Sequence, residues 1–183
     1  RGRAHGRRRR VSLLVPMRNE SANVDPCLDA LIAAAGPNDQ IVVLDDASTD
    51  DTLEKLRRRA AEEPRIEILT QSKLPPSWVG KPYACHRLSQ HATGEWFVFV
   101  DADVRISPDA LEHIEELGQR FAADVVTVAP LQVMGSWAER LIMPLLHLSY
   151  VSWLPLRMIP KVRDPRVLAA NGQVLAVRRE SYV

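Results

Sequence analysis

The sequence lacks the glycine-rich phosphate-binding motifs of the commonest nucleotide-binding proteins. Only 8 of its 183 residues are glycine, and neither G-x-x-x-x-G-K-[ST] nor G-x-G-x-x-G occurs in it. This absence excludes the P-loop NTPases and most dinucleotide-dependent enzymes. No serine lies in a G-x-S-x-G nucleophile elbow, so the sequence gives no support to acyl-enzyme chemistry either.

Cysteine is scarce, and histidine is scattered. The two cysteines, Cys27 and Cys85, have no metal-ligand spacing, and this usage suits a reducing compartment better than a secreted disulfide scaffold. The histidines after residue 80 do not form a ligand cluster by spacing. We therefore expect no histidine or cysteine metal site and two ordinary buried thiols.

Acidic residues are absent from the first ten positions, RGRAHGRRRR, which hold six of the 24 basic residues. The rest of the chain has 18 basic and 23 acidic side chains, a net charge of −5. A body of that sign repels nucleic acid, so we expect no nucleic-acid partner for it. We interpret residues 1–10 as a basic disordered arm, either simply solvated or able to bind phosphate groups of RNA or anionic lipid on the cytoplasmic side of a membrane.

The sequence also has no uninterrupted apolar run long enough to cross a bilayer of roughly 30 Å. The most apolar window, residues 141–156, contains Pro144, His147 and Pro155. A buried helix would explain this window, and so would a helix lying in a membrane interface. The second interpretation places aromatic residues at headgroup depth and basic residues beside them: Trp137, Tyr150, Trp153, Arg140, Arg157 and Lys161.

Hydrophobic residues make up 46% of the chain, enough for one sizeable core, and we expect one domain over residues 11–183. Short β-branched or aromatic runs alternate with helical patterns, which predicts an α/β fold with a largely parallel sheet. Strands are expected at 11–16, 41–46, 65–70, 96–103, 124–130 and 171–179. Helices are expected at 22–35, 53–63, 82–92 and 107–121, the last with Ser107 as its N-cap and Pro108 at its first position.

Polar and acidic side chains follow three of the predicted strands: Asn19, Glu20, Asp45, Asp46, Asp101 and Asp103. Ligands collect at the carboxyl ends of parallel strands. Carboxylates brought together there repel one another unless a cation or hydrogen-bond donors hold them. In an extended strand end, residues two apart point the same way, so Asp101 and Asp103 can face one Mg²⁺ or Mn²⁺ ion, with diphosphate oxygens as further ligands.

Lys81, in the segment WVGK, comes just before a predicted helix. Its ammonium group and the free backbone N–H groups of the helix could approach a phosphate. A lysine that is only a surface residue is the alternative. With the acidic strand ends, Lys81 predicts a metal-assisted site for a sugar diphosphate.

Four segments then occur in one order: VSLLVPMRNE, VVLDDASTDDT, WVGKPYAC and FVFVDADV. In this order they resemble the family 2 glycosyltransferases of GT-A fold, and the likeness covers almost the whole chain after the arginine-rich arm. A fifth segment, AANGQVLAVRRESY, is similar to a strand of membrane-associated members that modify carotenoid or hopanoid lipids. The resemblance implies a mostly parallel, twisted, Rossmann-like sheet flanked by helices.

The resemblance also implies an activity: inverting transfer of a sugar from a UDP- or GDP-linked donor to an acceptor hydroxyl, with a lipid as one candidate acceptor. Asp45 or Asp46 would hydrogen-bond the base, and Asp103 would be the principal metal ligand. Pro16, Asn19 and Glu20 would line the nucleotide pocket. Lys81 would lie near the donor and Asp101 near the ribose. Asn171, Gly172 and Gln173 would contact the sugar or the acceptor.

In the family, the general base is typically an acidic residue downstream of the last strand recognised here. No Glu-Asp or Gln-x-x-Arg-Trp motif is found before Val183. We therefore expect the base beyond Val183, donor binding by this chain, and a location at the cytoplasmic face of the cell membrane. Two alternatives remain open: a docking module without catalysis, and a receiver domain, which is disfavoured because a receiver's acidic pair ends its first strand.

Overall fold

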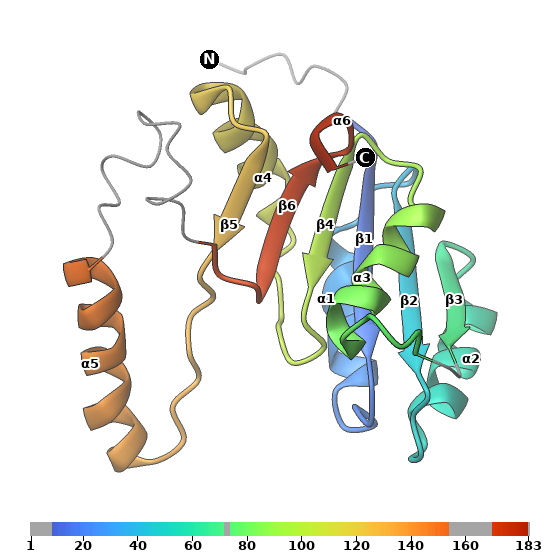
Figure 1. Cartoon of the computed structure of the whole chain (residues 1–183), viewed down its shortest axis with the longest axis horizontal. Helices are drawn as coiled ribbons and strands as arrows, with labels where there is room; N and C mark the ends of the chain where they lie inside the picture. Colours follow the sequence, from blue (N-terminus) through green and yellow to red (C-terminus); the bar gives the residue numbers. More distant parts are fainter. Residues whose placement is uncertain (1–8, 72–73, 154–169, 183) are drawn as a thin grey trace.

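The computed structural model describes residues 9–71, 74–153 and 170–182, which form a six-stranded sheet with helices on both faces (Figure 1). The strands are β1 (Val11–Met17), β2 (Gln40–Asp46), β3 (Ile66–Gln71), β4 (Trp96–Val100), β5 (Val125–Val128) and β6 (Val174–Arg178). The helices are α1 (Val24–Ala34), α2 (Thr52–Glu62), α3 (Gly80–His91), α4 (Ala110–Phe121), α5 (Trp137–Trp153) and α6 (Arg179–Tyr182). Residues 1–8 of the expected arm lie outside the described residues.

The sheet has the strand order β3-β2-β1-β4-β6-β5. Strand β1 pairs in parallel with β2 and β4, and β2 pairs in parallel with β3, whereas β6 runs antiparallel to both β4 and β5. The predicted α/β fold with a mostly parallel sheet is therefore confirmed. The order also argues against a receiver domain, whose sheet follows the order 2-1-3-4-5.

Two apolar layers hold the helices on the sheet, because successive strand residues point to opposite faces. Leu13 and Val15 of β1 join the larger core, which contains side chains of α1, α2 and α4. Leu14 and Phe97 join a smaller core under α3. Since β1 and β2 are covered on both sides, their apolar runs are nearly continuous, as is usual in buried parallel sheets.

Two local predictions near residue 100 are wrong. Strand β4 ends at Val100, three residues before the predicted end, and Asp101 to Val104 form a turn in which the Val104 N–H donates to the Asp101 carbonyl at 3.0 Å. Helix α4 begins at Ala110 and not at Ser107 or Pro108. The reason is that the Ser107 hydroxyl donates to Asp109 Oδ1 at 2.5 Å and does not cap the helix.

Helix α5 extends away from the sheet (Figure 1). It begins with a capping box, in which the Glu139 N–H donates to Ser136 Oγ and the Ser136 N–H donates back to Glu139 Oε2. Four apolar side chains at helical spacing, Trp137, Leu141, Leu145 and Leu148, are between 61% and 78% exposed. These α5 side chains are therefore not buried by the described part of this chain. No helix among the described residues has the length and apolarity to cross a bilayer.

Candidate functional site

A cavity of about 350 Å³ opens at the carboxyl ends of β1, β2 and β4, between these strand ends and the start of α3. Six residues predicted for the nucleotide site line it: Pro16, Glu20, Asp46, Lys81, Asp101 and Asp103. The other lining residues are Met17, Arg18, Gly80, Ala84 and Ala102. The structure thus brings together in space most of the side chains that the sequence placed at separate strand ends.

The turn from Asp101 to Val104, which we call the DxD turn, presents both carboxylates to this cavity. Strand alternation does not orient these carboxylates, as the sequence had predicted, because the turn lies beyond the extended strand. Instead, hydrogen bonds fix it: the Asp101 N–H donates to the Gln173 carbonyl at 3.0 Å, and the Val104 N–H closes the turn. A turn held by backbone bonds keeps the carboxylates of Asp101 and Asp103 within reach of one ligand.

Lys81 forms the main ion pair of the cavity. Its Nζ donates to Asp101 Oδ1 at 2.6 Å, with the lysine side chain 56% exposed and the aspartate side chain 24% exposed. Helix α3 begins just before it at Gly80 and has neither a side-chain cap nor an acidic residue in its first turn. The unpaired N–H groups of this helix end and the lysine together form a positive region beside the acidic turn.

Glu20 lies in the loop between β1 and α1, and its position is fixed from two sides. Its backbone N–H donates to Thr52 Oγ1 at 2.9 Å, which ties the loop to the start of α2. Its Oε2 accepts a hydrogen bond from Asn23 Nδ2 at 2.7 Å. The carboxylate is therefore oriented before any ligand binds.

Asp45 and Asp46 differ in their surroundings, although both end β2. Asp46 lines the cavity, and its Oδ1 accepts a hydrogen bond from Gln71 Nε2 at 2.8 Å. Asp45 is only 3% exposed; its Oδ2 accepts from the Ser48 N–H at 3.4 Å, and its Oδ1 has no partner among the described residues. A buried carboxylate oxygen without a donor is costly, but Asp45 is not among the lining residues, so Asp46 is the better placed of the two to contact a ligand in the cavity.

Asn19 and residues 171–173 are near the cavity but are not among its lining residues. Asn19 has a left-handed backbone, with φ of 54°, and its Oδ1 accepts from the Thr49 N–H at 2.8 Å. Asn171 Nδ2 donates to Gln173 Oε1 at 3.2 Å, and Gly172 lies between them in the turn before β6. These residues shape the loops around the cavity, and Gln173 reaches the DxD turn through its carbonyl group.

The oxygen donors fit a hard divalent cation. Asp101 and Asp103 lie on one short turn, and the Lys81 ammonium already stands as a cation against Asp101. Among the described residues no three His, Cys, Asp or Glu side chains are grouped as metal ligands. Mg²⁺ sites commonly use one or two carboxylates together with substrate phosphates, so the pair suits an ion that arrives with a diphosphate.

Cys27 lies buried beneath the site. Burial raises the pKa of its thiol to about 12, with a lowering influence from Arg105 and further raising influences from Asp103 and Glu20. The thiol is therefore protonated at neutral pH and is not suited to nucleophilic chemistry. The charged groups of Arg105, Asp103 and Glu20 are thus close enough to Cys27 to affect its pKa.

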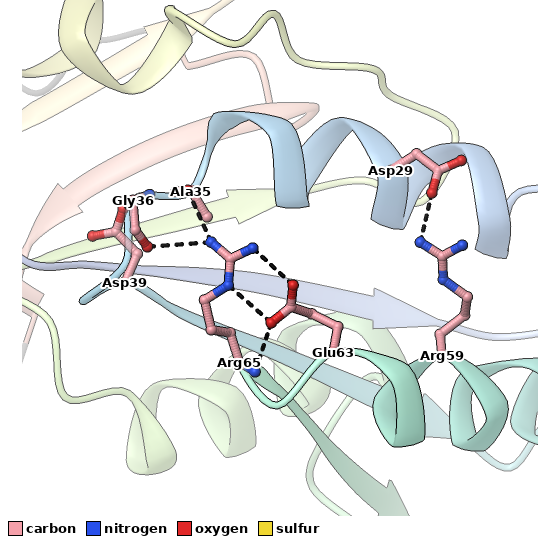
Figure 2. Close-up of polar contacts among 7 residues, drawn as sticks. All are labelled: Asp29, Ala35, Gly36, Asp39, Arg59, Glu63 and Arg65. Atoms are coloured by element: carbon pink, nitrogen blue, oxygen red, sulfur yellow. Dashed lines mark hydrogen bonds and ion pairs between the residues drawn. The ribbon is translucent and has the colours of Figure 1, made fainter.

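A larger hollow of about 900 Å³ lies at the opposite end of the strands, where their amino ends meet. Arg9, Arg10 and Arg65 are in its wall. Figure 2 shows that each nitrogen of the Arg65 guanidinium has an acceptor. Its Nε and Nη2 donate to the two oxygens of Glu63, and its Nη1 donates to the carbonyls of Ala35 and Gly36. This arginine stabilises the junction of α1, α2 and β3. Its guanidinium is therefore not available to bind an anion in the hollow.

Several residues of the site were not identified from the sequence. Arg18 adds a cationic side chain to the wall of the cavity, and the segment VSLLVPMRNE, which contains it, was the signal that could have indicated it. Asn23 and Arg105 support the site from behind through hydrogen bonds. No local pattern marks the pair, because Asn23 and Arg105 bond to each other across 82 positions of the chain.

The family model described as glycosyl transferase family 2 matches residues 12–182. The 4,4'-diaponeurosporenoate glycosyltransferase of Staphylococcus haemolyticus (strain JCSC1435) is 30% identical over 133 residues, 72% of this chain and 34% of that protein. The protein named Uncharacterized glycosyltransferase YibD of Escherichia coli (strain K12) is 27% identical over 131 residues, 72% of this chain and 35% of its own length. The chain thus spans about a third of the length of these relatives.

Solved structures of glycosyltransferases are also similar to this chain. The mannosyltransferase PcManGT from Pyrobaculum calidifontis, in complex with GDP-Man and Mn²⁺, superposes with a TM-score of 0.68 at 25% identity, over 95% of this chain and 46% of that chain. S. aureus TarS 1-349 in complex with UDP-GlcNAc gives a TM-score of 0.58 at 25% identity, over 69% of this chain and 36% of that one. The chain therefore belongs to glycosyl transferase family 2 and has the GT-A fold that its sequence motifs predict.

Proposed function

We propose that this protein binds a UDP- or GDP-linked sugar together with Mg²⁺ or Mn²⁺ and transfers the sugar to an acceptor hydroxyl. The observation that carries the proposal is the cavity in which the DxD turn, Lys81, Asp46 and Glu20 converge. Support comes from the family and from PcManGT, which was solved with GDP-Man and Mn²⁺ at 25% identity. TarS, solved with UDP-GlcNAc, supports the same class of donor.

In this proposal the charged residues of the DxD turn, Lys81 and Asp46 each have a chemical task. Asp103, assisted by Asp101, holds the divalent ion. A bound ion supplies positive charge against the diphosphate as it leaves. Lys81 and the free N–H groups at the start of α3 approach the same phosphates. Asp46, or the buried Asp45 beside it, accepts a hydrogen bond from the base.

The transfer step is proposed to invert the anomeric configuration. The acceptor oxygen forms a bond to the anomeric carbon from the face opposite the diphosphate, while the bond between that carbon and the phosphate oxygen breaks. The nucleoside diphosphate leaves with the electron pair of that bond. The acceptor's proton passes to a carboxylate acting as general base.

Calorimetry on the protein with UDP and GDP, each with and without Mn²⁺, tests the donor site. We expect binding that is stronger with Mn²⁺, and we expect Asp103→Asn to remove most of that metal-dependent gain. Asp29→Asn is the matched control, because it removes a carboxylate that faces Arg59 on the surface of α1 (Figure 2). If Asp103→Asn binds as tightly as the parent in Mn²⁺, the metal assignment is wrong.

We further propose a lipid acceptor and contact with the cytoplasmic face of the cell membrane. The S. haemolyticus relative is named as a 4,4'-diaponeurosporenoate glycosyltransferase, and this name supports an acceptor of lipid type. The apolar face of α5, formed by Trp137, Leu141, Leu145 and Leu148, is exposed at helical spacing and suits insertion at the headgroup level.

Flotation with anionic vesicles tests this membrane contact. We expect the protein to float and the double variant Leu141→Ser with Leu145→Ser to remain in the soluble fraction. Phe121→Ser on α4 is the control, because it removes a half-exposed apolar side chain elsewhere. If the parent protein stays unbound and instead self-associates through α5, a second copy covers this face and the membrane proposal is wrong.

A further inference from the structure

Arg105 follows the DxD turn directly and holds it through its guanidinium group. Its Nη1 donates to the carbonyls of Ala102 at 2.9 Å and Val104 at 3.0 Å. Its Nη2 donates to Asn23 Oδ1 at 2.8 Å, across 82 positions of the sequence. A single side chain thus fixes the turn and joins it to the residue that precedes α1.

Asn23 continues the connection to the cavity. Its Nδ2 donates to Glu20 Oε2 at 2.7 Å, and Glu20 lines the cavity. Guanidinium groups only donate and carboxylates only accept, so the amide between Arg105 and Glu20 has just one orientation that satisfies both neighbours. The chemistry of the three groups therefore fixes the order Arg105, Asn23, Glu20.

Arg105 is not itself among the residues that line the cavity. It is also exposed, so water and salt screen its charge. Its contribution therefore lies in three directed hydrogen bonds and not in a long-range field. A lysine could not replace it, because one ammonium group lacks the planar fork that reaches two carbonyls and an amide together.

We propose that Arg105 is a positioning residue that, through Asn23, sets the separation between Glu20 and the carboxylates of the DxD turn. This inference rests on the proposed function, because the separation matters only if the turn binds a metal and a nucleoside diphosphate. Without the guanidinium, the carbonyls of Ala102 and Val104 lose their donor and the Asn23 amide can rotate. The turn and the β1–α1 loop then move independently.

Hydrogen exchange on the protein tests the connection without any ligand. In Arg105→Met we expect faster exchange of amides in both residues 101–105 and residues 20–24. Arg120→Met is the matched control, because Arg120 is a cation on the neighbouring α4 whose guanidinium lies over the adjacent Phe121 ring. Unchanged exchange in either segment of Arg105→Met overturns the proposal, whatever the variant does to binding.

Calorimetry with UDP or GDP then tests the consequence for the site. Because the DxD turn and the β1–α1 loop lose their connection, we expect about tenfold weaker binding in Mn²⁺ for Arg105→Met, equivalent to about 1.4 kcal/mol, and little change without metal. Arg105→Lys should recover little of this loss. Asn23→Ala should reduce binding similarly, and the double variant should bind no worse than Arg105→Met alone.

The outcomes distinguish the positioning role of Arg105 from the proposed function. If the two substitutions add fully, or if binding falls equally with and without metal, Arg105 is a general structural residue and the positioning role is wrong. If the parent binds no nucleoside diphosphate although Arg105→Met loosens both segments, the proposed function fails while the connection itself stands.

Discussion

Replacement of Lys81 by methionine should change two affinities in opposite directions. The Lys81 ammonium lies 2.6 Å from Asp101 Oδ1, so a metal ion that binds Asp101 must compete with it. The pair is more than half exposed on the lysine side, and exposed pairs of this kind contribute about 0.2–1 kcal/mol. Affinity for Mn²⁺ alone should therefore rise by about 1.4- to 5-fold in Lys81→Met.

Affinity for a nucleoside diphosphate should fall in the same variant. If Lys81 moves from Asp101 to a phosphate oxygen, its loss removes a hydrogen bond between charged groups, worth about 1.5–3 kcal/mol, or about 10- to 150-fold in affinity. Mn²⁺ titration followed by electron paramagnetic resonance gives the first affinity, and calorimetry with UDP or GDP in Mn²⁺ gives the second. Arg87→Met is the matched control, because it removes a positive charge from the same helix outside the cavity.

Two results would refute this reasoning about Lys81. If both affinities fall together, the lysine holds Asp101 in its binding geometry and does not compete with the metal. If neither affinity changes relative to Arg87→Met, Lys81 is an ordinary surface residue and its ion pair with Asp101 has no part in binding.

Three further predictions concern the scaffold. Gly94→Ala should lower the free energy of unfolding by about 1–3 kcal/mol in urea titrations, because a Cβ there would lie 2.5 Å from the Ser12 backbone nitrogen. The pKa of Glu63 is lowered from 4.5 to about 2 by its hydrogen bonds with Arg65, so the unfolded chain takes up the proton first and stability should fall as pH drops from about 4.5 to about 2. In Glu63→Gln stability should fall less steeply over this pH range, and a profile identical to the parent's would contradict the assignment. Iodoacetamide should label the buried Cys27 thiol no faster than the protein unfolds, and mass spectrometry at neutral pH would reveal faster labelling.

The fold could be predicted from the sequence because its central strands contain short, almost entirely apolar runs. The run from Trp96 to Val100 contains no polar residue, and the structure buries all five side chains. Alternation of such runs with amphipathic segments predicted the helices and the mostly parallel sheet. The direction of β6 was not predicted, because a strand that turns back beside β4 has the same local pattern as one that continues in parallel.

The site was only partly accessible, and the reason lies in long-range hydrogen bonds. The rule that loops meet at the carboxyl ends of parallel strands was sufficient to group Glu20, Asp46 and Asp101. It could not indicate that β4 stops at Val100, since the turn that follows is fixed by the Asp101 N–H donating to the carbonyl of the distant Gln173. The surroundings of α5 could not be predicted either, because an apolar window has the same sequence pattern whether it packs on a protein core or contacts a membrane.

The arrangement around the DxD turn gives its two aspartates unequal freedom. Asp101 is held at both ends: its N–H donates to the Gln173 carbonyl, and its carboxylate pairs with Lys81. Within the described part of the chain, the Asp103 carboxylate takes part in no hydrogen bond or ion pair of this kind, although it lines the same cavity. A metal ion therefore meets less competition at Asp103 than at Asp101, which supports Asp103 as the principal ligand. In the proposed complex Asp101 would become the second ligand, as Lys81 leaves it for the diphosphate.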